Sequence, residues 1–169
     1  MARIQYPECG KIVNTHGCHG GVKIESWCDT PAVLAALPVV YVKKGGELVP
    51  YAVRRAAISR NMVFADLAGI STMEQADAMR NTVLYANRDD LKIPEGVFLI
   101  AELIGLPVYH HESGVQLGTL KDVIHPGASD VYVITTAMGE AMVPVVAEFV
   151  KRVDESGIYL APIEGMFAQ

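Results

Sequence analysis

The sequence lacks the long apolar run that a membrane-spanning helix requires. Its longest apolar stretch covers residues 31–42, is interrupted by Pro38, and falls short of the roughly 20 residues that cross a bilayer. Polar and charged residues, beginning with Arg3, also interrupt the N-terminus before the apolar core of a signal peptide could form. We therefore expect a cytoplasmic protein without membrane contacts.

Cysteine is scarce. The chain has three cysteines, Cys9, Cys18 and Cys28, and an odd number without a secretory signal predicts free thiols in a reducing compartment. His16 and His19 lie in the same stretch, which raises the alternative of a metal-dependent enzyme. The spacing argues against it, because neighbouring residues of an extended chain, such as Cys18 and His19, point to opposite faces. We expect no metal and no cofactor.

Recognisable catalytic motifs are also lacking. The sequence has no G-x-x-x-x-G-K-[ST] phosphate loop, and the glycines around Gly17 and Gly20 precede a strand-like segment, which predicts a turn or bulge. His125 lies between Asp122 and Asp130, but no nucleophile is spaced to join them. A charged turn is the favoured interpretation, so we expect no catalytic residues and no enzyme activity.

What the sequence does have is alternation of apolar and polar residues with a period of two, which is typical of strands. In the first half this pattern, with the Gly45-Gly46 turn, predicts a six-stranded closed barrel, with strands at residues 11–14, 22–26, 39–43, 48–56, 62–67 and 82–86. Two helices are expected within it. One covers residues 30–37, and the other follows a capping box formed by Ser71 and Glu74.

The second half repeats the same kind of pattern after a polar segment, residues 87–95, that we interpret as a linker. Strands are predicted at residues 107–110, 116–124, 131–135, 141–145, 150–154 and 158–161. The sequence therefore predicts a mainly β protein with two small barrels in tandem, with domains at residues 1–90 and 91–169.

Charge is distributed unevenly between these halves. Residues 1–90 contain ten Lys/Arg and nine Asp/Glu, a balance of +1, whereas residues 91–169 contain four and ten, a balance of −6. An acidic second half suits a basic protein better than a phosphate backbone. A direct RNA-binding module is the alternative, and its cations would come from the first half: Lys43, Lys44, Arg54, Arg55 and Arg60. Aromatic residues make up only 7% of the chain, so we expect weak rRNA contacts at most.

Several motifs, in order along nearly the whole chain, resemble the bacterial ribosome maturation factor family RimM. They are Gly10-Lys-Ile-Val-x-x-His16-Gly-x-x-Gly20, Arg88-Asp-Asp-Leu91, Glu102-Leu-Ile-Gly105-Leu, Gly114-x-x-Leu-Gly118-x-Leu-x-Asp-Val123, His125-Pro-Gly-Ala-x-Asp130-Val-Tyr-Val and Val143-Pro-Val-Val-x-Glu-Phe-Val150. Each motif is modest alone, but together they are specific.

The resemblance implies an N-terminal six-stranded barrel like those of translation factors and a C-terminal PRC-type barrel. It implies a chaperone-like factor, not an enzyme, that aids 16S rRNA processing and assembly of the 30S head. The implied partners are the immature 30S subunit and its head protein S-nineteen, bound mainly through the second barrel. The negative charge of the second half is consistent with such a basic partner.

Candidate site residues also follow from the resemblance. Partner contacts are expected at Phe98, Leu99, Ile100, His125 and Tyr132, and a structural or ribosome-facing loop at His16, Gly17 and Gly20. The family often has a Tyr-Tyr-Trp-like run where this chain has residues 98–100. This run either anchors an interface or packs the domain junction, and both interpretations stay open here.

Overall fold

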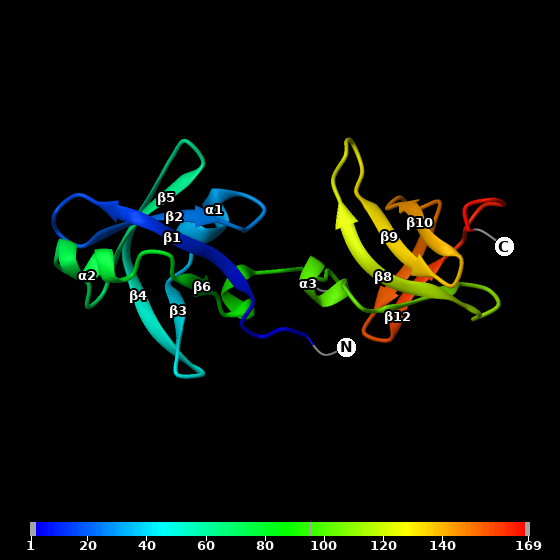
Figure 1. Cartoon of the computed structure of the whole chain (residues 1–169), viewed down its shortest axis with the longest axis horizontal. Coiled ribbons are helices and arrows are strands. Elements are labelled where there is room, and N and C mark those ends of the chain that lie inside the picture. The colour runs from blue at the N-terminus through cyan, green and yellow to red at the C-terminus, as the bar shows by residue number, and fades with distance from the viewer. Residues whose placement is uncertain (1–2, 95, 168–169) are drawn as a thin grey trace. The chain divides into compact units, whose positions relative to one another are not determined.

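The computed structural model describes residues 3–94 and 96–167, which form two compact units (Figure 1). We call residues 5–93 the first unit. The second unit consists of the described residues from Pro94 onward together with Arg3 and Ile4, which join it from the other end of the chain.

The first unit is a closed six-stranded barrel, as the sequence predicts. Its strands follow one another around the barrel in the order β1-β2-β5-β4-β3-β6, and β6 pairs with β1 to close it. They are β1 (Glu8–His16), β2 (Gly21–Ser26), β3 (Val39–Lys44), β4 (Glu47–Ser59), β5 (Met62–Leu67) and β6 (Val83–Tyr85). Alternate side chains point inward, so that Ile12, Ile24 and Leu84 are almost completely buried.

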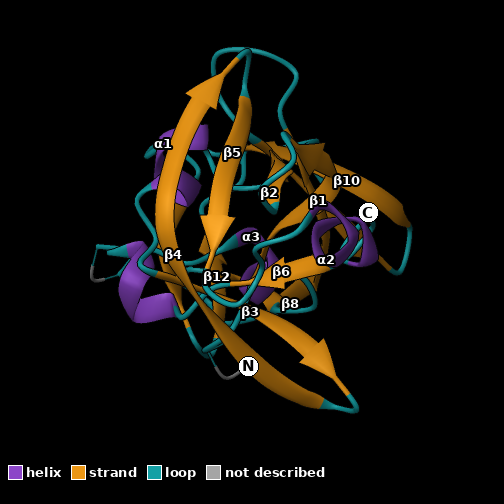
Figure 2. Cartoon of the chain, turned by 90° about the vertical axis from the view of Figure 1, so that its left-hand side faces the viewer, coloured by secondary structure: helices purple, strands orange, loops and turns teal. Residues whose placement is uncertain are grey.

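Strand β4 is long enough to take part in two hairpins at different sides of the barrel. Gly45 and Gly46 turn the chain between β3 and β4, and both have positive φ angles. Arg60 and Asn61, also with positive φ, turn it between β4 and β5. Figures 1 and 2 show β4 curving across the barrel from one hairpin to the other.

Two short helices lie between strands of the first unit. Helix α1 (Pro31–Ala35) begins after Thr30, as predicted. Helix α2 (Met73–Ala78) begins one residue later than the predicted capping box. Thr72 is the N-cap, and Gln75 donates its backbone N–H to the Thr72 hydroxyl while its side chain accepts from the Thr72 N–H. Gln75 therefore fulfils the role predicted for Glu74.

The segment interpreted as a linker is partly folded. It begins with a 3-10 helix, η1 (Arg88–Leu91), in which the Asn87 side chain accepts a hydrogen bond from the Asp89 N–H. Arg88 is buried, and its N–H donates to the carbonyl of Gln5. The ordered first unit thus continues to Leu91 and beyond, while Glu95 of the predicted linker lies outside the described residues.

The second unit is one six-stranded sheet in the order β10-β9-β8-β7-β12-β11. Its strands are β7 (Pro107–His110), β8 (Gln116–Ile124), β9 (Val131–Thr136), β10 (Gly139–Pro144), β11 (Val150–Asp154) and β12 (Gly157–Leu160), preceded by helix α3 (Ile100–Leu103). The β7–β12 pair is parallel and the remaining pairs are antiparallel. Val143 from one edge strand and Val150 from the other belong to the same apolar core, so the sheet curls around it.

Within the described residues, no helix is both long and apolar enough to span a membrane.

Candidate functional site

The loop between β1 and β2 is shaped by glycines, as its sequence predicts. Gly17 has a φ of 71° and lies in open space, whereas Gly20 has a φ of 90° and is buried. A Cβ atom at Gly20 would lie 2.5 Å from the carbonyl oxygen of Ile70, so only glycine fits. Gly20 therefore holds the loop against the segment that leads into α2.

The His16 ring packs on Phe64 of β5, with 4.4 Å between ring centroids. Lys23 is the cross-strand neighbour of Phe64, and Arg55, whose side chain is 85% exposed, lies 3.9 Å from Asp66. We call His16, Lys23, Arg55 and Phe64 the His16 face. Sequence reasoning singled out His16 but missed Phe64, whose only signal was its place on the polar side of an alternating strand.

The five cations of the RNA-binding alternative do not gather in one place. Lys43 and Lys44 lie at the β3–β4 hairpin, where their ammonium groups are each 5.3 Å from a tyrosine ring centroid. Arg54 and Arg55 lie in the middle of β4, and Arg60 is in the β4–β5 turn. The two hairpins extend to opposite sides of the barrel (Figure 1), so these residues form no single basic patch.

Residues Val97–Ile100 lead into α3 and form what we call the α3 surface. Val97 and Ile100 are exposed to 47% and 43%, although both are apolar. Phe98 is half-buried and packs against the core of the second unit, and Leu99 is half-buried at the start of the helix. Phe98 thus packs within the second unit and Ile100 is exposed to solvent, and both interpretations of the run stay predictions.

The buried carboxylate of Glu102 holds the backbone of the α3 surface in place. Glu102 is only 3% exposed, and its two carboxylate oxygens accept hydrogen bonds from the backbone N–H groups of Leu99 and Ile4, both at 3.0 Å. Sequence reasoning quoted Glu102 within a family motif but gave it no role. A buried acid three residues after a helix start is a signal of this kind of cap.

His125 and Tyr132 have different surroundings. The exposed His125 lies in the β8–β9 loop, where its Nδ1 is 2.7 Å from the Asp130 carboxylate. Tyr132 is only 5% exposed and belongs to the core, and burial, followed by the charge of Asp130, raises its pKa. His125 and Asp130 are therefore the surface groups of this loop, and Tyr132 packs beneath them.

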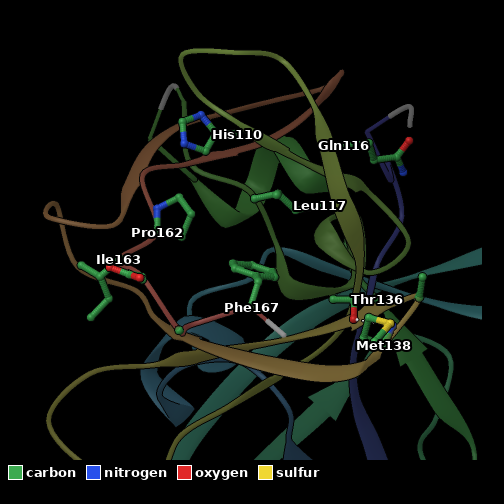
Figure 3. A pocket seen from close by; sticks show the side chains of 11 residues that line it. His110, Gln116, Leu117, Thr136, Met138, Pro162, Ile163 and Phe167 are labelled. Atoms are coloured by element: carbon green, nitrogen blue, oxygen red, sulfur yellow. Dashed lines mark hydrogen bonds between the residues drawn. The ribbon is translucent and has the colours of Figure 1, made fainter. Parts of the chain in front are cut away.

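A groove with mixed polar and apolar lining lies where the β9–β10 turn meets the segment that follows β12. The groove has a volume of about 530 Å³, and its lining includes Leu117, Met138, Ile163 and Phe167. Figure 3 shows the Phe167 ring at the centre of the labelled side chains. Met138 and Ile163 are 63% and 58% exposed. Sequence reasoning did not identify this groove.

The cysteines do not converge on a metal-like arrangement. Cys9 is in the core, where burial, and secondarily the charge of Cys28, raises its pKa to about 12, while Cys18 is exposed in the loop. Within residues 3–94 and 96–167, no three His, Cys, Asp or Glu side chains are placed to hold a metal ion.

Comparison with known proteins assigns both units. Residues 8–91 match the family model of the RimM N-terminal domain, and residues 100–165 match that of the RimM PRC barrel domain. Proteins named ribosome maturation factor RimM include one from Ruminiclostridium cellulolyticum, 33% identical over 89% of either chain, and one from Clostridioides difficile, 32% identical over 97% of either chain. A solved Pseudomonas aeruginosa structure titled as a 16S ribosomal RNA processing protein is 23% identical, covering 92% of this chain and 96% of that one, with a TM-score of 0.49.

Proposed function

We propose, on the premise that this chain belongs to the RimM family of ribosome maturation factors, that it assists assembly of the 30S head by binding the small-subunit protein S-nineteen through its second unit. In this role the protein is a chaperone-like binding factor for the immature small subunit. Its action on 16S rRNA processing would then follow from helping the head to fold, without catalysis by its own side chains.

The observation that carries this proposal is the α3 surface on an acidic unit. Val97 and Ile100 are apolar yet exposed, and exposed apolar groups rimmed by charge are typical of protein interfaces. The described residues of the second unit include four Lys/Arg and nine Asp/Glu, which favours association with a basic ribosomal protein. Glu102 holds the backbone of the surface in place, so little ordering would be needed on binding.

The test is calorimetric titration of the full-length protein with purified S-nineteen. We expect the substitution Ile100→Asp to weaken binding by at least tenfold, equivalent to about 1.4 kcal/mol. Ile163→Asp is the matched control, because Ile163 is another exposed isoleucine of the same unit but lies in the groove. Thermal unfolding of both variants checks that the fold is intact.

Each outcome is informative. Loss of binding with Ile100→Asp alone supports the α3 surface. Loss with Ile163→Asp alone would transfer the contact to the groove and contradict the proposed position. Unchanged binding in both variants would contradict a contact at either surface.

A second, weaker contact with rRNA is proposed for the His16 face of the first unit. The His16 and Phe64 rings are in contact beside Lys23, and Arg55 of the neighbouring strand lies 3.9 Å from Asp66, two residues after Phe64. Cations next to aromatic rings suit single-stranded RNA. Phe64→Ala should weaken binding to naked rRNA, and Lys23→Ala should lower the slope of log affinity against log salt by about 0.7. A slope that no first-unit variant changes would argue against this contact.

A further inference from the structure

Three side chains form a ladder across the outer side of strands β11, β12 and β7. The Arg152 guanidinium carbon is 3.8 Å from the centroid of the Tyr159 ring, and the Tyr159 and Tyr109 rings stack with centroids 5.4 Å apart. The strand register explains this order, because Arg152 pairs with Tyr159 and Tyr159 pairs with Tyr109. The ladder is therefore built on paired strands of one sheet.

Neighbouring groups hold the ladder in one conformation. The Tyr159 hydroxyl is 2.8 Å from the Ser156 hydroxyl, which in turn bonds the Asp154 carboxylate. That second hydrogen bond is the main cause that lowers the pKa of Asp154, and Asp154 pairs with Arg152 Nε at 3.0 Å. A Cβ atom at Gly157 would lie 2.8 Å from Tyr109 Cε2, so glycine leaves room for the ring.

A cavity of about 390 Å³ opens beside the ladder, and its lining includes His111, Glu112, Ser113, Lys151, Arg152 and Tyr159. The register of β11 shifts between Val150 and Arg152. This bulge leaves both Lys151 and Arg152 exposed, although neighbours in a regular strand point to opposite faces. Two cations thus face one cavity.

These cations are unusual in their unit. The second unit contains only four Lys/Arg. Three of them are paired with carboxylates: Lys121 with Glu140 at 3.1 Å, Arg152 with Asp154 at 3.0 Å and Arg3 with Glu155 at 3.9 Å. Lys151 instead donates to the carbonyl of Ala147. Two of the four Lys/Arg of an acidic unit thus line one cavity, together with Glu112, and an aromatic stack borders this cavity.

We propose that this cavity, together with the Arg152–Tyr159–Tyr109 ladder, binds single-stranded RNA. A base stacks on the outer face of the Arg152 guanidinium, and the adjoining phosphate pairs with Lys151. The planar stack favours RNA over an acidic peptide, because bases stack on arginine planes and aromatic rings, whereas carboxylates bind the edge of a guanidinium and do not stack on its face. This site goes beyond the function proposed above, which assigns the second unit a protein partner only.

The test measures binding of the full-length protein to a fluorescent single-stranded RNA of about ten nucleotides, a length within the site sizes of small β-barrel binders. Arg152→Lys keeps the charge but removes the planar stack, and we expect it to weaken binding by about fivefold or more. Lys151→Ala should lower the salt slope by about 0.7. Lys121→Ala is the matched control and should change neither.

The outcomes separate the alternatives. A selective effect of Arg152→Lys and Lys151→Ala, with unchanged melting temperatures, supports the site. Equal weakening by Lys121→Ala would show that RNA responds only to the net charge of the unit, which would contradict a specific site. No weakening by any variant would also overturn the proposal. A poly-glutamate peptide that competes as well as unlabelled RNA would overturn the RNA assignment in favour of acidic peptides. Binding of S-nineteen is measured in the same variants and should not change.

Discussion

The two units differ in closure and in how they place charge. The first unit closes its barrel by pairing β6 with β1. Its Lys/Arg side chains are scattered over both hairpins and the strands between them. The second unit has two edge strands, β10 and β11, and two of its four cations, Lys151 and Arg152, lie on the edge strand β11. Lys151, the β11 bulge and Pro144 at the end of β10 discourage pairing with foreign strands. Six strands therefore form a closed barrel in the first unit and a curled sheet with two edge strands in the second.

The largest expected effect tests whether the units are energetically separate. Leu84, on the closing strand β6, and Ile134, on β9, are both fully buried. Replacing either with alanine should cost about 2–5 kcal/mol. In calorimetry, Leu84→Ala should lower the melting temperature of one transition and Ile134→Ala that of another. If both variants shift one shared transition, the units unfold together and the comparison fails.

The next effect concerns the cap of the α3 surface. Glu102→Ala removes the acceptor of two backbone N–H groups and should destabilise the second unit by about 2–3 kcal/mol, since an unsatisfied buried donor is costly. Urea unfolding measures this change. Glu155→Ala is the control, because it removes an exposed acid of the same unit that also reaches the N-terminal segment. An equal loss in the control would mean that general charge, not the cap, matters.

A smaller effect distinguishes two glycines of one loop in the first unit. Gly17→Ala should cost about 1–2 kcal/mol because of its positive φ alone. Gly20→Ala has the same backbone cost and an additional clash with Ile70, so its free energy of unfolding should fall further. Equal losses would show that the loop moves away from Ile70 without cost. Chemical denaturation of the pair provides the measurement.

The last effect is small near pH 9, grows only at more alkaline pH, and is restricted to the first unit, which contains all three cysteines. The folded-state pKa of Cys9 is raised to about 12 from 9.0, so above pH 9 the unfolded state loses the proton first. Stability contributed by this thiol therefore falls as the pH rises, by at most about 1.4 kcal/mol per pH unit. Cys9→Ala should flatten the alkaline loss, and the exposed Cys18→Ser should leave it unchanged, as followed by melting temperature.

Strand positions were largely predictable because alternation and turn glycines are local signals. All twelve segments predicted from period-two patterns are strands in the structure, with ends displaced by a few residues. The closed barrel of the first unit was also predicted and is confirmed. The helix near Ser71 was found one residue away, because two capping boxes overlap in the sequence and only Thr72 with Gln75 forms.

Contacts between distant strands were not predictable. Arg152 and Tyr159 belong to one hairpin, but Tyr109 joins them only through the parallel pairing of β12 with β7, which no local signal marks. The same holds for His16 and Phe64, which belong to different strands. The exposure of Ile100 beside half-buried Phe98 depends on the phase of a four-residue helix, which is too short to leave a periodic signal.

The attachment of Arg3 and Ile4 to the second unit has a consequence for biosynthesis. These residues are translated before the first barrel, yet their partners Glu102 and Glu155 are translated after it. The first barrel can therefore fold before the partners of Arg3 and Ile4 have been synthesised. The second unit is thus completed by two separate chain segments. An affinity tag fused directly before Arg3 would therefore disturb the contacts of the second unit, although the first barrel follows the tag in sequence.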